Sequence, residues 1–192
     1  MGAIRVELRD GGYAEIEVEA IVSMTKRTDL GAGDPPTQVN LDEGSLVTVD
    51  SIRTIVARAG DDAGLRELAG ADAEWPVAVA LGKVTHLTKR DEERSLDDDP
   101  TQVHMANGDT LLSADSIRTI QAIMGLHGLP MEEIDVIGTE RPAAAVPGHV
   151  LSAFETDVDD GRNSVLVMAG GKSLVVRDIP ATLTGSPQGP KA

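Results

Sequence analysis

Two pairs of basic residues are the side chains in this chain best suited to bind a charged group. Lys26 and Arg27 recur as Lys89 and Arg90, and each pair follows a threonine at the end of a predicted strand. An ammonium and a guanidinium side by side can hold a carboxylate or phosphate through charge-assisted hydrogen bonds. The pairs therefore predict two equivalent anion sites. The alternative is that each pair only neutralises the acidic loop that follows it.

Other polar residues recur together with the basic pairs. A Thr-Gln pair opens the next strand after a proline, and an arginine lies just inside the following helix. A helix N-terminus attracts anions, so it would complement the basic pair. The alternatives are strand initiation after proline, a surface ion pair of the arginine, and an arginine at a protein interface. The candidate binding residues are Lys26, Arg27, Thr37, Gln38, Arg53, Lys89, Arg90, Thr101, Gln102 and Arg118.

Metal-binding patterns are weak. His86 and His104 lie on adjacent predicted strands, but the first copy has Ser23 and Asn40 there, and the chain has no cysteine. Segment 157–163 is rich in aspartate, yet its glycine is the fifth residue, whereas a calcium-binding EF-hand loop needs glycine at the sixth position and glutamate at the twelfth. We therefore predict no metal and no cofactor.

Signatures of catalysis are missing as well. Gly170-Gly171-Lys172-Ser173 resembles the end of a phosphate-binding loop, but Leu166 stands where that motif needs its first glycine, and the segment is a predicted turn between strands. The sequence contains no nucleophile elbow, no cysteine nucleophile and no His-Glu-x-x-His motif. We therefore expect that the protein is not an enzyme.

The candidate residues belong to a stretch that the chain contains twice. Segment 34–55 returns as 98–120, with a period of roughly 63 to 65 residues. In both copies an alternating hairpin leads to an Asp-Ser helix cap and to isoleucines spaced for one buried helix face. A third copy, from Val150, keeps the hairpin but loses the basic and Thr-Gln positions, and Pro180 weakens its helix.

These patterns predict a mainly β, β-rich α+β fold of three tandem small units. Each unit has three or four antiparallel strands and one short helix, and the third is degenerate. Small units have exposed sheet edges that must be covered or paired. The predicted organisation is unit 1 at 1–60 with an N-terminal hairpin, a linker at 61–74, unit 2 at 75–125, a linker at 126–147, unit 3 at 148–184 and a disordered tail at 185–192.

Composition limits the classes of partner. With 32 acidic and 17 basic side chains the formal charge is −15, which disfavours direct binding to nucleic acid or to an anionic membrane. The acidic surface favours solubility, with high-salt adaptation and mimicry of nucleic acid as alternatives. No apolar run approaches the roughly 20 residues of a membrane span, and the N-terminus lacks a signal-peptide core. We expect a cytoplasmic protein, or one built into a particle made in the cytoplasm.

The repeats favour a non-enzymatic structural or assembly protein. Its surfaces would mediate self-association or docking in a larger complex, such as a virus or phage particle, so the expected partners are copies of itself or other protein subunits. The first alternative is a binding module that holds an anion or small ligand, or sequesters a protein, at two equivalent sites. The second is an acidic inhibitor that mimics nucleic acid.

Overall fold

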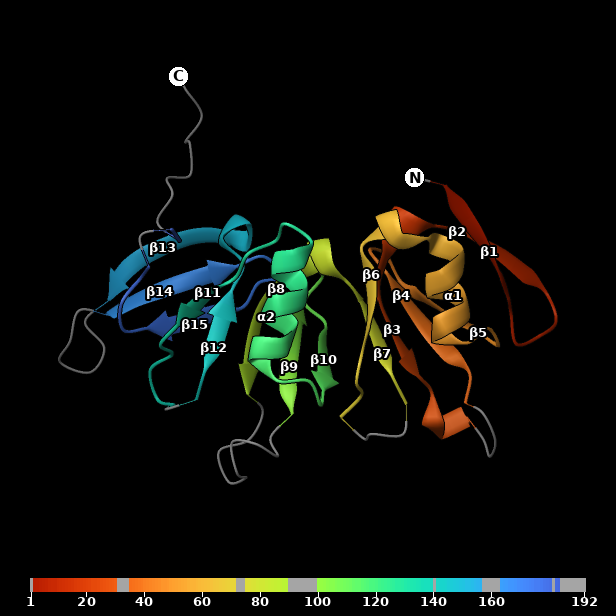
Figure 1. Cartoon of the computed structure of the whole chain (residues 1–192), viewed down its shortest axis with the longest axis horizontal. Coiled ribbons are helices and arrows are strands. Elements are labelled where there is room, and N and C mark those ends of the chain that lie inside the picture. The colour runs from red at the N-terminus through yellow and green to blue at the C-terminus, as the bar shows by residue number, and fades with distance from the viewer. Residues whose placement is uncertain are drawn as a thin grey trace, which may run out of the picture. The chain divides into compact units, whose positions relative to one another are not determined.

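The computed structural model is built mainly from antiparallel strands, which confirms the predicted β-rich class (Figure 1). It describes residues 2–30, 35–71, 75–89, 100–139, 141–156, 163–180 and 182–183. Among the described residues, strands account for 47% and there are two α-helices. The chain divides into two compact units, Met1–Lys83 and Val84–Ala192. The predicted tail at 185–192 lies outside the described residues.

The first compact unit contains a hairpin and a five-stranded sheet. The sheet has the strand order β5-β4-β3-β7-β6, and all its pairs are antiparallel. Strand β3 therefore pairs with β4 on one side and with β7, which comes later in the chain, on the other. The elements are β1 (Ala3–Glu7), β2 (Tyr13–Glu17), β3 (Ile21–Lys26), β4 (Thr37–Leu41), β5 (Ser45–Thr48), α1 (Ile52–Ala59), β6 (Leu65–Leu68) and β7 (Val77–Ala80).

The second compact unit repeats this sheet and adds a smaller one. Its sheets have the orders β10-β9-β8-β12-β11 and β13-β14-β15. The elements are β8 (Val84–Lys89), β9 (Thr101–Met105), β10 (Thr110–Ser113), α2 (Ile117–Leu126), β11 (Glu132–Ile134), β12 (Ala143–Ala145), β13 (Val150–Thr156), β14 (Asn163–Met168) and β15 (Ser173–Val176).

The structural repeat is a leading hairpin followed by a three-stranded meander. The leading hairpins are β1–β2, β6–β7 and β11–β12, and the meanders are β3–β5, β8–β10 and β13–β15. A 3₁₀ turn joins each hairpin to its meander, at Val18–Ala20, Leu81–Lys83 and Pro147–His149. Each five-stranded sheet therefore combines the meander of one repeat with the leading hairpin of the next.

This arrangement corrects the predicted linkers. Segment 61–74 contains β6, and segment 126–147 contains β11 and β12, so both contribute strands to a sheet. Leu65 and Leu68 are buried in β6, and the three alanines of β12 are also buried. Such short strands carry little alternation of polar and apolar residues. They join the sheets because β7 and β12 pair with the distant strands β3 and β8, and β6 and β11 pair with β7 and β12 in turn.

Local signals account for the helices. The side chains of Ser51 and Ser116 accept hydrogen bonds from the backbone N–H of Thr54 and Thr119, both at 3.1 Å, and so cap the two N-termini. Helix α1 ends at Ala59, and the residue that follows, Gly60, has a φ of +82°. Helix α2 continues past Gly125 to Leu126, and Met124 of its last turn is buried.

The helices cover their sheets with apolar side chains. Ile52 and Ile55 of α1 pack in one core with Met24 of β3 and Val39 of β4. In the third repeat no helix follows β15 among the described residues, but Leu183 is 4% exposed and lies in the core with Leu166 and Val176. Leu183 follows its meander at the same spacing as Ile55, so it contributes the apolar cover of the missing helix.

Each compact unit also shows how a leading hairpin contacts the meander that follows it. Leu8, just after β1, bridges Thr48 of β5, and the N–H of Val49 donates to the carbonyl of Glu7 at 3.0 Å. In the third repeat Val136 bridges Val176 of β15, and the N–H of Arg177 donates to the carbonyl of Asp135 at 2.9 Å. The contact is therefore a repeated feature of the fold.

Candidate functional site

The outer edge of β13 is where the third repeat differs most from the other two (Figure 1). The meanders can be aligned residue by residue, because the first strand of each has a register shift at the same place. The shifts lie between Ile21 and Ser23, between Val84 and His86, and between Val150 and Ser152. This bulge makes Leu151 equivalent to Val22 of β3 and to Thr85 of β8.

The aligned positions differ sharply in exposure. Val22, Ser23 and Met24 are 0% exposed, because β7 pairs with β3 on that side. The equivalent residues of β8 are equally buried under β12. In β13 the three equivalent residues are exposed, and among the described residues no strand pairs with this edge. Leu151 is 59% exposed and Phe154 53% exposed. The third meander therefore has an apolar, unpaired edge.

The basic pair of the first repeat is bound to its own surroundings. Arg27 makes a two-pronged ion pair with Asp29, at 2.7 and 2.6 Å, and donates to the side chain of Gln38 at 2.9 Å. Gln38 donates to Asn40 at 2.7 Å. The ammonium of Lys26 donates to the carbonyl of Pro35 at 2.7 Å. These contacts agree with the alternative in which the pair neutralises and fastens its own loop.

The same ion pair shifts the titration of its members. The hydrogen bond from Arg27 holds the pKa of the Asp29 carboxyl below its usual value, and the same bond raises the pKa of Arg27. Both side chains are exposed to solvent, so the pair adds little to stability. In the second repeat Arg90 lies outside the described residues, and Lys89 lines the pocket described below.

The second repeat replaces the Ser23–Asn40 contact with two stacked histidines. The ring centroids of His86 and His104 are 4.0 Å apart, and the rings are nearly parallel at 10°. The ammonium of Lys172, from the β14–β15 turn, lies 3.1 Å from Nδ1 of His104. Because an ammonium can only donate, Nδ1 of His104 accepts. Its proton therefore lies on Nε2, 2.9 Å from the hydroxyl of Thr88.

His86 is held in the opposite tautomer. The hydroxyl of Thr85 donates to the carbonyl of His104, so it accepts from Nδ1 of His86 at 2.8 Å. Nε2 of His86 is then an unprotonated, buried nitrogen that has no hydrogen-bond partner among the described residues. Burial lowers the pKa of His86 to about 3, with further lowering by His104 and Lys172. Burial and then Lys172 lower the pKa of His104 to about 4. Both rings are neutral at physiological pH.

A close approach of two turns brings Lys172 to this site. Gly170 has a φ of +85°, and a Cβ at this position would lie 2.6 Å from the carbonyl oxygen of Met105. Only glycine fits there. Residues 169–172 form the turn between β14 and β15, so Gly170-Gly171-Lys172-Ser173 leads from strand to strand and is not a phosphate-binding loop that opens a helix. Among the described residues no cluster of three metal-ligating side chains is present.

The remaining predicted site residues have mainly structural positions. Thr37 is completely buried, and the hydroxyl of Thr101 donates to the carbonyl of Asp115 at 2.7 Å. Gln102 accepts from Thr88 at 3.2 Å. Arg53 is 84% exposed and lies 3.6 Å from Glu67 of β6, which is the surface ion pair weighed for it in the sequence analysis.

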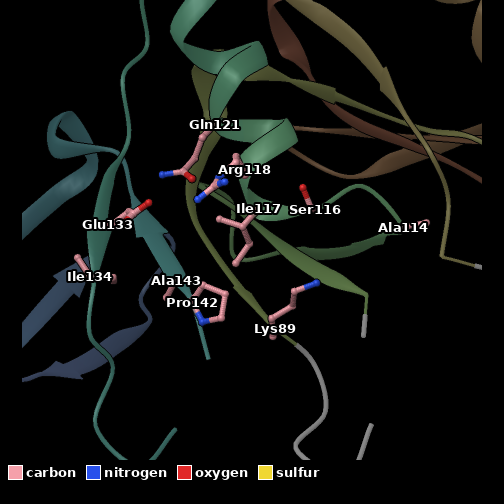
Figure 2. A pocket seen from close by; sticks show the side chains of 10 residues that line it. All are labelled: Lys89, Ala114, Ser116, Ile117, Arg118, Gln121, Glu133, Ile134, Pro142 and Ala143. Carbon is pink, nitrogen blue, oxygen red and sulfur yellow. The ribbon is translucent and has the colours of Figure 1, made fainter. Parts of the chain in front are cut away.

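Arg118, the counterpart of Arg53, lines a pocket of about 440 Å³ in the second compact unit (Figure 2). Arg118 and Gln121 reach in from α2, Glu133 comes from β11, and Lys89 comes from the end of β8. Ser116, which caps α2, also lines the wall. The pocket thus brings together two predicted binding residues, Lys89 and Arg118, with one carboxylate.

Sequence reasoning missed two parts of this picture. It did not identify the open edge of β13, because an edge is defined by the absence of a distant partner strand. It also missed Lys172 as a neighbour of His104, because the two residues are 68 positions apart and belong to different repeats. The one local indication of a special site in the second repeat was that histidines replace the Ser23 and Asn40 of the first repeat.

Comparison with known proteins adds no functional assignment, since the chain matches no protein-family model, no curated protein and no solved structure. No helix in the described part of the chain combines the length and apolar character of a membrane span.

Proposed function

We propose that the protein is a non-enzymatic assembly protein that self-associates, or docks into a larger complex, through its sheet edges. The observation that carries this proposal is the exposed stretch 151–153 on β13, at positions that are buried in β3 and β8, followed by the exposed Phe154. An unpaired strand with exposed apolar side chains is a template for another strand. The absence of cysteine is in keeping with assembly in the cytoplasm.

The charge of the protein supports protein partners over nucleic acid. A formal charge of −15 repels phosphate backbones, whereas backbone pairing between strands needs no net charge. The broader setting, a coat or accessory protein of a virus or phage particle, is proposed by analogy with other assemblies of repeated β units.

The test is the mass in solution over a range of protein concentrations, measured by light scattering or sedimentation. We expect oligomers for the natural chain and monomers for the variants Leu151→Asp and Phe154→Asp. Leu126→Asp is the matched control, because Leu126 is 87% exposed on α2 and lies away from the strand edge. A natural chain that remains monomeric at high concentration would refute self-association.

A second candidate function is binding of a small carboxylate or phosphate ligand in the pocket of the second unit. Lys89, Arg118 and Ser116 at the capped start of α2 all line that pocket, and this favours an anion. A thermal-shift screen of small carboxylates and phosphates tests it. Arg118→Ala should abolish any stabilisation, while Arg53→Ala, the same change in the first repeat, should leave it intact. Equal loss in both variants would exclude this pocket.

A further inference from the structure

We infer that the β1–β2 hairpin of a second copy of this chain pairs with the open edge of β13, so that the copies join head to tail. This inference rests on the proposed self-association and identifies the partner segment and its register. Hairpins of the same type already fill the two equivalent edges. The hairpin β6–β7 pairs with β3, and β11–β12 pairs with β8.

The second compact unit contains the complete template for such a joint. Its hairpin β11–β12 makes two contacts: β12 pairs with β8 of the meander before it, and Val136 bridges Val176 of the meander after it. In the described part of the chain, the hairpin β1–β2 makes the second contact, through Leu8 and Thr48, and has no equivalent of the first. Among the described residues the outer edge of β2 has no partner strand, just as β13 has none. Within the described ranges, β2 and β13 thus each carry one half of a contact that the two filled edges complete.

The repeat predicts the register of the new pairing. Ser23 lies opposite Val79 and Met24 opposite Ala78, while the second repeat pairs His86 with Ala145 and Leu87 with Ala144. In each filled edge the two hairpin residues come two and three positions before the 3₁₀ turn. In β2 the residues at this distance from Val18 are Ile16 and Glu15. We therefore expect Ser152 to lie opposite Ile16, and Ala153 opposite Glu15.

Side-chain sizes match across this register. In both filled edges a large residue of the meander, Met24 or Leu87, faces a small alanine of the hairpin. In the proposed joint the sizes are exchanged, because Ala153 of β13 is small and Glu15 of β2 is long. Glu15 would be too long beside Met24 or Leu87, where the pairs are buried. The β1–β2 hairpin thus suits β13 better than it suits the other two edges.

Disulfide trapping tests the pairing, since the natural chain has no cysteine. Directly opposed residues of antiparallel strands have Cα atoms about 4.5 to 5.5 Å apart, within the range for a disulfide. Two single variants, Glu15→Cys and Ala153→Cys, are purified separately and mixed under mild oxidation, so that a covalent dimer can arise only between copies. We expect a dimer joined by one disulfide to be the main product.

Arg5→Cys provides the matched control. Arg5 lies opposite Glu15 within the hairpin, one strand farther from the new edge, at a distance from Ala153 of about 10 Å that is too long for a disulfide. Arg5→Cys mixed with Ala153→Cys should give about tenfold less dimer. Equal yields from both mixtures would overturn the register.

The outcomes separate this inference from the general proposal. Oligomers in solution without the Glu15–Ala153 disulfide would overturn the hairpin joint and leave self-association standing. A monomer by light scattering would overturn both. A variant that carries both cysteines and forms its disulfide at the mass of one chain would overturn pairing between copies.

Discussion

The stacked histidines predict that mild acid weakens the second compact unit. His86 and His104 are 1% and 5% exposed, and each is held as the neutral ring. A proton added to Nε2 of His86 would be buried without an acceptor, and a proton on Nδ1 of His104 would face the ammonium of Lys172. In mild acid the two histidines therefore bind protons in the unfolded chain but not in the folded protein.

The sign and size of the effect follow from the pKa values. The unfolded histidines have a pKa of about 6.5, while the folded pKa values are about 3 for His86 and about 4 for His104. Stability is complete above pH 6.5 and is lost as the pH falls toward the folded values. At pH 5 each histidine removes about 2 kcal/mol from the free energy of unfolding, or about 4 kcal/mol together as an upper figure.

Urea unfolding at pH 7 and pH 5, followed by circular dichroism, measures this loss. The lower limit of pH 5 keeps most carboxylates ionised, since their ordinary pKa values are about 4. The control is the double variant His86→Ser/His104→Asn, which installs the hydrogen-bonded pair found at Ser23 and Asn40. It should lose less than about 1 kcal/mol over the same range. An equal loss in both proteins would refute the reasoning, as would histidine pKa values near 6.5 in NMR titrations.

Three further predictions concern single contacts. Ser116→Ala removes the cap of α2 and should lower the free energy of unfolding by about 1 kcal/mol, measured by urea unfolding against the natural chain. Arg58→Ala should lower the free energy of unfolding by about 1 to 2 kcal/mol, because the guanidinium donates to Asp50 at 2.8 Å and to the backbone of β1 at 2.9 Å. Thermal unfolding measures this loss, and an unchanged midpoint would contradict it. Ala153→Met should weaken self-association by about tenfold in sedimentation experiments, because the new methionine and Glu15 would then be two large side chains opposite each other. Adding Glu15→Ala should restore self-association. Failure to restore it would argue against the pairing of a small residue of β13 with a long residue of β2.

The contact between the β1–β2 hairpin and the start of α1 depends on the ionised carboxyl of Asp50, which accepts hydrogen bonds from the N–H of Glu7 and from Arg58. Burial pushes the pKa of the Asp50 carboxyl upward, yet the hydrogen bonds from Arg58, from the N–H of Glu7 and from Thr48 outweigh burial and lower the pKa. The contribution of these bonds is therefore present near neutral pH and is lost as the pH falls through the lowered pKa. This loss comes at a more acidic pH than the loss caused by the histidines.

Local chemistry made part of the fold predictable. The turns at 10–12 and 42–44 and the serine caps of the helices involve neighbours in sequence, so residue types alone identify them. The leading hairpins of the later repeats could not be found in this way. Ala143–Ala145 has no alternation, and its place in the sheet is set by β8, more than 50 residues earlier. Pairing over such distances leaves no local pattern.

The candidate site shows the same division. The repeated Lys-Arg and Thr-Gln positions were visible in the sequence, but only the structure places Arg27 on Asp29 and Gln38. Likewise, the sequence marks Arg53 and Arg118 as equivalents, whereas the structure places Arg53 by Glu67 and Arg118 in a pocket. Both arginines lie near a leading hairpin that comes later in the chain, β6 for Arg53 and β11 for Arg118, so the repeated arginine alone does not predict its neighbours.

Each five-stranded sheet contains strands from two consecutive repeats, and this has a consequence for gene duplication. Each leading hairpin completes the sheet of the repeat before it, so a tandem insertion of whole repeats would place every new hairpin on an existing edge. Such an insertion would leave the pairing of the existing strands β3 with β7 and β8 with β12 as a template for each new sheet. Each added repeat would therefore complete one more five-stranded sheet, so the number of repeats could change by recombination without a new kind of strand pairing.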